Sequence, residues 1–256
     1  MKKVFTALIA ATALFGSVAT ASAGGSIKDE PMGRECGPGP FSGAYFGVHG
    51  GWVRADSEQT GTDSFGNVTK TSTDADGWTI GVLSGYGWQC GRTYFGIESD
   101  INWMDVDQSL TIIGTGTLGT PFSQSLRTSY DYFSTMRGRI GIVHDTALFY
   151  LTGGLAMASV EHRFESTTPT IAFSQSNSDT RWGWTVGGGV ELSRGHWTLR
   201  GEVLYVDLGE ESYRYQVVSG CTTCDTTIKW KDDFVVARVG LTFKLHREEQ
   251  PYEPLK

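Results

Sequence analysis

Residues 232–245, with the sequence DDFVVARVGLTFKL, alternate between apolar and polar side chains with a period of two. The odd-numbered positions from 235 to 245 hold Val, Ala, Val, Leu, Phe and Leu, whereas positions 238, 240, 242 and 244 hold Arg, Gly, Thr and Lys. Because successive side chains of a β-strand point to opposite faces of the sheet, this pattern predicts a strand with one apolar and one polar face.

Seven segments upstream show the same alternation, and several have Trp or Tyr near the ends of their apolar rows. Aromatic residues at both ends of an apolar row are typical of strands that span a bilayer. The pattern therefore predicts an all-β fold, an eight-stranded antiparallel up-and-down transmembrane β-barrel that residues 232–245 close. The other predicted strands are residues 44–53, 77–89, 93–104, 129–143, 146–161, 181–192 and 197–208.

The connections between the predicted strands alternate between long and short. Outer-membrane barrels have short periplasmic turns and longer external loops. A soluble, lipocalin-like barrel is the alternative, and it would turn its apolar face to the lumen. The short turns are predicted at residues 90–92, 144–145 and 193–196, and the long polar connections at 56–76, 105–127, 162–180 and 209–231.

The two ends of the chain do not follow the barrel pattern. Residues 1–23 have a basic start, an apolar stretch and an Ala-Ser-Ala site before Gly24, which predicts a cleaved N-terminal signal peptide. A retained anchor helix is the alternative, but the apolar stretch is short for a membrane span. We expect a periplasmic lead-in at 24–43, the barrel at 44–245 and a polar C-terminal tail at 246–256.

Composition restricts the function further. The 256 residues carry a formal net charge of −7, which disfavours nucleic acid as a partner because phosphate groups would be repelled. The 34 Gly, 8 Trp, 10 Tyr and 13 Phe fit closely packed strands and aromatic girdles better than an enzyme core.

Charged residues of both signs fall on the polar face of the predicted strands. An eight-stranded barrel is only wide enough for side chains to fill, so these groups must meet inside it. Because unpaired charges are costly in a narrow lumen, we expect a paired network that plugs the barrel. The alternative is that some of these charges face solvent in a soluble fold. The residues are Glu98, Asp100, Glu191 and Glu202 with Arg137, Arg139, Arg200 and Arg238.

Short motifs along residues 43–245 resemble the small outer-membrane β-barrel (porin family) proteins of alphaproteobacteria, in their surface-antigen branch, which are distantly similar to the OmpA transmembrane domain. The resemblance implies an integral outer-membrane protein that contributes to envelope integrity and to host or surface interaction. Some members of the family bind haem or act as weak porins. The motifs are GAYFG at 43–47, the glycine-rich stretch 81–87, YFGIE at 94–98, RGRIG at 137–141, YLTGGLA at 150–156, GGGVE at 187–191, EVLYVDLG at 202–209 and RVGL at 238–241.

The C-terminus departs from the family pattern. Such barrels end on an aromatic residue that the assembly machinery reads, whereas here Phe243 is followed by Lys244, Leu245 and the polar tail. How the insertion signal is presented is therefore open.

Four cysteines in an exported chain are expected to pair. The predicted topology places Cys36 and Cys90 on the periplasmic side, and Cys221 and Cys224 in the fourth outer loop. Of the three connectivities we favour Cys36 with Cys90 and Cys221 with Cys224. Residues 221–224 also have the C-x-x-C spacing of redox and zinc motifs, but no second C-x-x-C supports that role.

Three classes of function fit the sequence. We expect a structural and surface-interaction scaffold with a plugged lumen and four external loops. The alternative is a ligand-binding or weakly pore-forming barrel for haem or small solutes, with His49 in the lumen or His162 in the third loop as haem ligands. An enzyme that modifies outer-leaflet lipid would need a Ser or Asp with a His at the outer rim, and no persuasive triad is present.

We therefore expect neither an enzyme nor a metal or cofactor. The expected location is the outer membrane of a Gram-negative bacterium. The expected partners are outer-membrane lipid and lipopolysaccharide, the barrel assembly machinery, and host or surface ligands bound through the loops. We expect a monomer.

Overall fold

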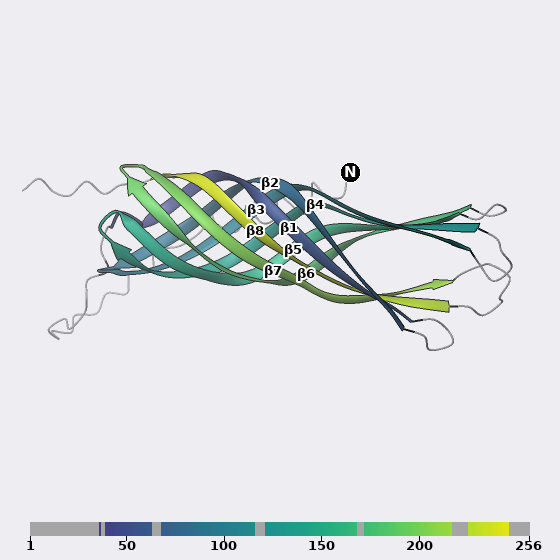
Figure 1. Cartoon of the computed structure of the whole chain (residues 1–256). Helices are drawn as coiled ribbons and strands as arrows, with labels where there is room; N and C mark the ends of the chain where they lie inside the picture. Colours follow the sequence, from purple (N-terminus) through teal and green to yellow (C-terminus); the bar gives the residue numbers. More distant parts are fainter. Residues whose placement is uncertain are drawn as a thin grey trace, which may run out of the picture. The chain divides into compact units, whose positions relative to one another are not determined.

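The computed structural model describes residues 36, 39–62, 68–115, 121–167, 172–216 and 225–245. Each strand pairs antiparallel with the next, and the last pairs with the first, so the sheet closes into a barrel (Figure 1). This confirms the predicted fold class. The strands are β1 (Gly43–Thr62), β2 (Val68–Cys90), β3 (Thr93–Thr115), β4 (Pro121–His144), β5 (Ala147–Thr167), β6 (Ala172–Arg194), β7 (Trp197–Gln216) and β8 (Asp225–Lys244).

Several predicted segments lie outside the described residues. They are the signal peptide at 1–23, most of the lead-in and the tail at 246–256. Within the described residues, no helix has the length and apolar character needed to cross a membrane.

The outer surface of the barrel is apolar between two levels of aromatic side chains. Leu151 is 68% exposed on the outside, whereas its neighbour Tyr150 is 4% exposed and points inward. Near the short turns, the ring of Phe243 lies 5.7 Å from that of Phe46. Near the long hairpins, the rings of Trp184 and Tyr205 lie 5.6 Å apart. The period-two alternation thus places apolar side chains outside, as predicted.

The short turns lie where the sequence places them. Gly91, Asp145 and Gly195 adopt positive φ angles of 61°, 52° and 65°, as two-residue hairpin turns require.

The predicted long connections are wrong in extent, because most of their residues belong to strands. β1 and β2 stay paired up to Thr62 and Val68. β3 and β4 stay paired up to Thr115 and Pro121. These stretches are rich in Ser, Thr and Asp on both faces, so they lack the apolar alternation from which strands were predicted. They still form strands because Thr favours strands and because backbone pairing does not require an apolar face.

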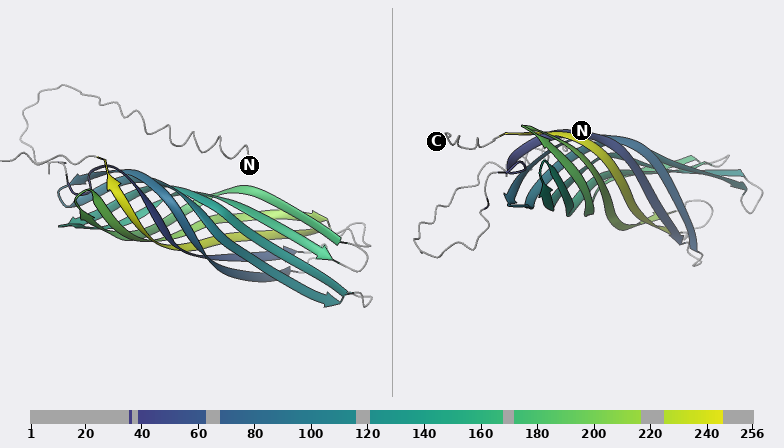
Figure 2. Two further views of the ribbon diagram at one scale, coloured as in Figure 1. Left: turned by 90° about the horizontal axis from the view of Figure 1, so that it is seen from above. Right: turned by 60° about the vertical axis from the view of Figure 1, so that its left-hand side comes forward.

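At the long-hairpin end the barrel separates into two sheets. Pairing of β2 with β3 runs only from Cys90 to Trp78, and pairing of β6 with β7 runs only from Arg194 to Trp184. Beyond these points β3, β4, β5 and β6 form one four-stranded sheet, and β7, β8, β1 and β2 form the other. Figure 1 and the right-hand view of Figure 2 show these two groups of strands diverging. We call this part the forked extension.

The interior has three layers, of which the sequence predicted only the charged one. Charged residues occupy the middle. A lower layer at the short-turn end holds Phe41, Tyr94, Val143, Leu148 and Tyr150. An upper apolar layer lies toward the forked extension and includes Val53, Ala55, Met104, Val106, Tyr130, Phe133, Ala156, Ala158, Val160, Leu204, Val206, Leu208, Phe234 and Val236. The expected polar face fails in the upper layer because the inward positions 234 and 236 of β8 are Phe and Val.

Candidate functional site: the barrel lumen

All eight charged residues named from the sequence lie inside the barrel, and each is at most 5% exposed. They come from strands far apart in the chain, because the closed sheet brings every second side chain of each strand to a common interior. Together they form what we call the lumen network: Glu98 and Asp100 on β3, Arg137 and Arg139 on β4, Glu191 on β6, Arg200 and Glu202 on β7, and Arg238 on β8.

Glu98 lies at the centre of the lumen network. Its carboxylate accepts hydrogen bonds from Arg137 Nη2 at 2.6 Å, Arg200 Nη1 at 2.7 Å and Arg139 Nη1 at 3.2 Å. The hydroxyl of Tyr45 donates a further hydrogen bond at 2.9 Å. Three arginines and one tyrosine therefore surround one carboxylate whose side chain is fully buried.

The other acids connect the remaining arginines. Glu202 accepts hydrogen bonds from Arg238 Nε at 2.8 Å and Arg137 Nη1 at 3.0 Å. Asp100 accepts from Arg238 Nη2 at 2.8 Å and Arg137 Nη2 at 2.9 Å. Glu191 pairs with Arg139. Four carboxylates meet four guanidinium groups, so the buried set has no net charge, and bonds of this kind are what make buried ions tolerable.

Tyrosines complete the network, a role that the sequence analysis did not assign to them. Tyr150 donates its hydroxyl to Glu202 at 2.8 Å and accepts from Arg200 at 2.9 Å. The guanidinium of Arg139 lies 3.8 Å from the centre of the Tyr150 ring. An inward tyrosine next to an inward charge on a neighbouring strand is the signal that could have identified these contacts.

The two histidines named as haem candidates are in different parts of the barrel. His49 is buried in the lumen, with Nε2 2.5 Å from Asn102 Oδ1 and 3.1 Å from Arg238 Nη1. A Cβ atom at Gly81 would lie 2.5 Å from His49 Nε2, so the ring is packed against the β2 backbone. His162 is on β5, and its side chain lies outside the described residues.

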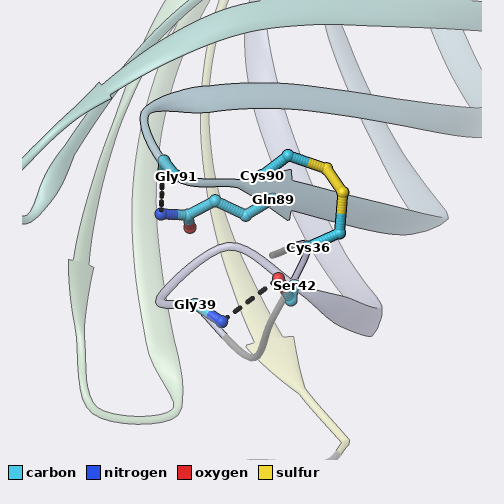
Figure 3. The surroundings of a disulfide bond; sticks show 6 residues. All are labelled: Cys36, Gly39, Ser42, Gln89, Cys90 and Gly91. Atoms are coloured by element: carbon cyan, nitrogen blue, oxygen red, sulfur yellow. Dashed lines mark hydrogen bonds between the residues drawn. A yellow bond between two sulfur atoms is a disulfide. The ribbon is translucent and has the colours of Figure 1, made fainter. Parts of the chain in front are cut away.

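The end of the lead-in closes the short-turn end of the barrel. The predicted disulfide between Cys36 and Cys90 is formed (Figure 3). Phe41 is 3% exposed and reaches the lower layer. The centre of its ring lies 6.4 Å from the centre of the Tyr94 ring and 4.9 Å from Lys244 Nζ. The described part of the lead-in is thus packed into the barrel, which its irregular sequence did not predict.

Cys221 and Cys224, the second predicted pair, lie outside the described residues.

A second buried ion pair, which the sequence reasoning missed, lies at the base of the forked extension. Arg181 on β6 pairs with Asp232 on β8, and its Nε lies 3.4 Å from Oε2 of Glu211 on β7. Ser57 Oγ donates a hydrogen bond to Asp232 at 2.7 Å. Arg181 is in phase with the inward Gly183 and Thr185, so the alternation could have placed it inside.

One titratable group on the outside of the forked extension has a shifted pKa. Asp107 accepts a hydrogen bond from Ser129 Oγ at 2.7 Å and from Arg127 Nη2 at 2.9 Å. The hydrogen bond from Ser129, aided by Arg127, holds the pKa of Asp107 below its usual range against the opposing effect of burial.

The three layers place buried side chains at three levels of the interior. Within the described strands, no group of three or more His, Cys, Asp or Glu residues is arranged to hold a metal ion.

An apolar outer surface between two aromatic levels, around an interior of paired ions, defines an outer-membrane β-barrel. The family model described as outer membrane protein beta-barrel domain matches residues 8–222. The chain belongs to this family, and it is an outer-membrane protein, as the sequence predicted.

Relatives with curated descriptions agree with this assignment. The chain is 29% identical over 262 residues to the 31 kDa outer-membrane immunogenic protein of Brucella melitensis, which covers 95% of this chain and 100% of that protein. It is 30% identical over 133 residues to the 22 kDa outer membrane protein of Rhizobium leguminosarum, covering 52% and 53% of the two chains. Both relatives come from alphaproteobacteria, as the resemblance implied.

Among solved structures, the outer membrane protein OprG from Pseudomonas aeruginosa aligns with 79% of this chain and 97% of its own, with a TM-score of 0.48 and 13% identity. Neisserial surface protein A aligns with 80% of this chain, with a TM-score of 0.37 and 13% identity.

Proposed function

We propose that the protein is a closed outer-membrane scaffold that presents its forked extension at the cell surface for interaction and does not conduct solutes. The observation that carries this proposal is the charge-neutral lumen network held between two apolar layers. Water and ions could pass only if these buried pairs separated, and breaking one buried pair costs about 3–5 kcal/mol.

The orientation follows from the connections. Outer-membrane barrels have short turns in the periplasm and long hairpins outside, so the forked extension belongs outside the cell. Loops and hairpins on a rigid scaffold are the usual place for recognition. The lipid of the outer membrane, including lipopolysaccharide, surrounds the barrel. Insertion by the barrel assembly machinery, a monomeric state and binding of host or surface ligands are parts of the proposal.

A haem-binding or pore-forming role is not favoured by the described residues. His49 has its Nε2 against Asn102 and Arg238, and its ring lies in contact distance of the β2 backbone at Gly81. A haem at this position would have to displace both polar partners and open the packed layer. The proposal likewise includes no catalytic step.

Single-channel recording in planar bilayers tests the closed lumen. We expect the refolded protein to give no persistent conductance steps. The variant Phe41→Ala, which removes a side chain of the lower layer and leaves the lumen network in place, should also be silent. Persistent steps with the wild-type protein would overturn the proposal, and steps with Phe41→Ala alone would show that the network is not what closes the lumen.

Surface presentation is tested by labelling intact cells with a membrane-impermeant maleimide. A cysteine introduced at exposed Thr111 on the extension should react, and one at exposed Asp145 in a short turn should not. The background carries Cys221→Ser and Cys224→Ser to remove competing thiols. The reverse labelling pattern would contradict the proposed orientation.

A further inference from the structure

The forked extension leaves four strand edges that no other described strand pairs with. They are residues 68–77 of β2, 106–115 of β3, 172–183 of β6 and 208–216 of β7. An unpaired strand edge presents a row of backbone N–H and C=O groups that can pair with another extended chain. The fork is therefore a place where backbone recognition can occur.

We call the β2–β3 and β6–β7 boundaries the two seams. The two sheets separate for a local reason at each seam. The register of β3 against β4 shifts between Trp103 and Val106, and the register of β7 against β8 shifts between Asp207 and Glu210. Gly209, in the second of these irregularities, has a φ of +73°. Bulges of this kind bend a strand and end its pairing, which is what happens to β3 toward β2 and to β7 toward β6.

Both seams end at the same local sequence. The last paired residues are Trp78 on β2, within Gly77-Trp78-Thr79, and Trp184 on β6, within Gly183-Trp184-Thr185. The hydroxyl of Thr79 donates to the carbonyl of Trp103 at 3.0 Å, and that of Thr185 to the carbonyl of Tyr205 at 2.9 Å. The repeated arrangement shows that the fork is a built feature of the barrel.

The free edges differ in charge. Lys70, Asp74 and Asp76 lie along the β2 edge, and Glu210 and Glu211 lie along the β7 edge. Charged side chains on an edge oppose the addition of another strand. The β2 and β7 edges, which bound one of the two sheets, are thus protected.

The β3 edge lacks this protection beyond Asp107, its last charged residue, and Gln108, whose side chain contacts Ala55 of β1 and Thr73 of β2. Residues 108–115, with the sequence QSLTIIGT, contain no charged residue and include β-branched Thr and Ile, which favour strands. Ser109 and Thr111 are exposed, and Ile113 is 80% exposed. This edge therefore combines available backbone groups with side chains of its own that are uncharged and partly apolar.

We propose that the β3 edge at residues 108–115 binds an extended, uncharged segment of a partner polypeptide by strand addition. This inference rests on the proposed presentation of the forked extension outside the cell. In this mode the backbone hydrogen bonds supply affinity, and contacts of alternate side chains supply specificity. Here the alternate side chains of the partner would lie beside Thr111 and Ile113, which favours β-branched residues in the bound segment.

Fluorescence anisotropy with the full mature chain in detergent micelles tests this inference. The probe is a short labelled peptide of alternating Thr and Val, and its control is the same peptide with alternate amides N-methylated. We expect saturable binding of the plain peptide, and binding at least about tenfold weaker for the methylated one because it cannot donate its backbone hydrogen bonds. Amide exchange at residues 108–115 should slow when the plain peptide is bound.

Matched variants locate the site. Thr111→Lys places a charge on the β3 edge and should weaken binding at least about tenfold, whereas Ser72→Lys places the same charge on the β2 edge and should leave it unchanged. Absence of saturable binding, equal binding of the two peptides, or an equal effect of the two variants would overturn the inference. Concentration-dependent dimers that Thr111→Lys abolishes would also overturn it, because the occupant would then be a second copy of this chain.

The result of the peptide-binding experiment does not depend on whether the lumen is closed. A chain that binds the peptide but conducts ions would contradict only the closed lumen. A silent chain that does not bind would contradict only strand addition.

Discussion

Removal of one carboxylate from the lumen network should destabilise the barrel strongly. Glu98 accepts hydrogen bonds from three arginines and one tyrosine, and its side chain is fully buried. Glu98→Gln keeps the shape but leaves four arginines against three carboxylates in a dry interior. Breaking a buried pair in this way costs about 3–5 kcal/mol, because the charge left behind has no compensating partner.

The measurement is equilibrium unfolding in urea of the protein in lipid vesicles, followed by tryptophan fluorescence and by the change in gel mobility on heating. Glu165→Gln is the matched control, because it removes the same charge from a half-exposed pair on the extension. Oε1 of Glu165 lies 4.0 Å from Nη1 of Arg163. An exposed pair contributes less than about 1 kcal/mol.

A double variant separates charge from packing. Arg200 donates two hydrogen bonds to Glu98, at 2.7 and 3.1 Å, so Arg200→Met combined with Glu98→Gln restores neutrality. The double variant should be more stable than the sum of the single effects by about 1–3 kcal/mol. A free energy of unfolding for Glu98→Gln within the range of the Glu165→Gln control, or strict additivity in the double variant, would refute the reasoning.

Three further perturbations test other parts of the molecule. The Cys36–Cys90 disulfide joins residues 54 apart, so replacing both with Ser should lower the free energy of unfolding by about 4 kcal/mol if chain entropy dominates, measured as above with and without reductant. The pKa of Asp107 is lowered by Ser129, so its contribution to stability is present above the usual carboxyl pKa and is lost as the pH falls through the folded value. Amide-exchange protection factors in the extension, which correct for the intrinsic exchange rate at each pH, should therefore fall at that acid pH, and less so in Asp107→Asn. Gly209→Ala should cost about 1–2 kcal/mol because its φ is +73°.

The alternation of single strands predicted the barrel and its central charges, because period two determines which face each side chain occupies. Glu98 and Arg137 were both placed inside on this basis, whereas the pairs within the network depend on the register between strands, which the alternation does not give. The alternation does not determine what fills each level of the interior. At residues 234–237, Phe and Val point inward while Val and Ala point outward, so the sequence reads as a continuous apolar run and the upper layer is hidden.

The fork was not predictable from the same pattern. The irregularities after Trp103 and Asp207 change the register between strands, which the alternation along one strand does not report: β3 keeps its inward even-numbered positions through Gln108 although its register against β4 shifts. Arg181 was missed for a related reason, because it was placed at the first residue of a predicted strand that in fact begins at Ala172.

The level at which the seams open follows from the change of solvent. Inside a bilayer every backbone N–H and C=O group must be paired, because water is absent and each unpaired group costs several kcal/mol. The last pairs of the two seams involve Trp78 and Trp184, which belong to the aromatic level at the long-hairpin end of the apolar surface. Beyond that level water can satisfy a free edge, so the barrel can divide there without this cost. Strand addition is therefore restricted to the part of the barrel that lies outside the membrane, where a partner can reach it.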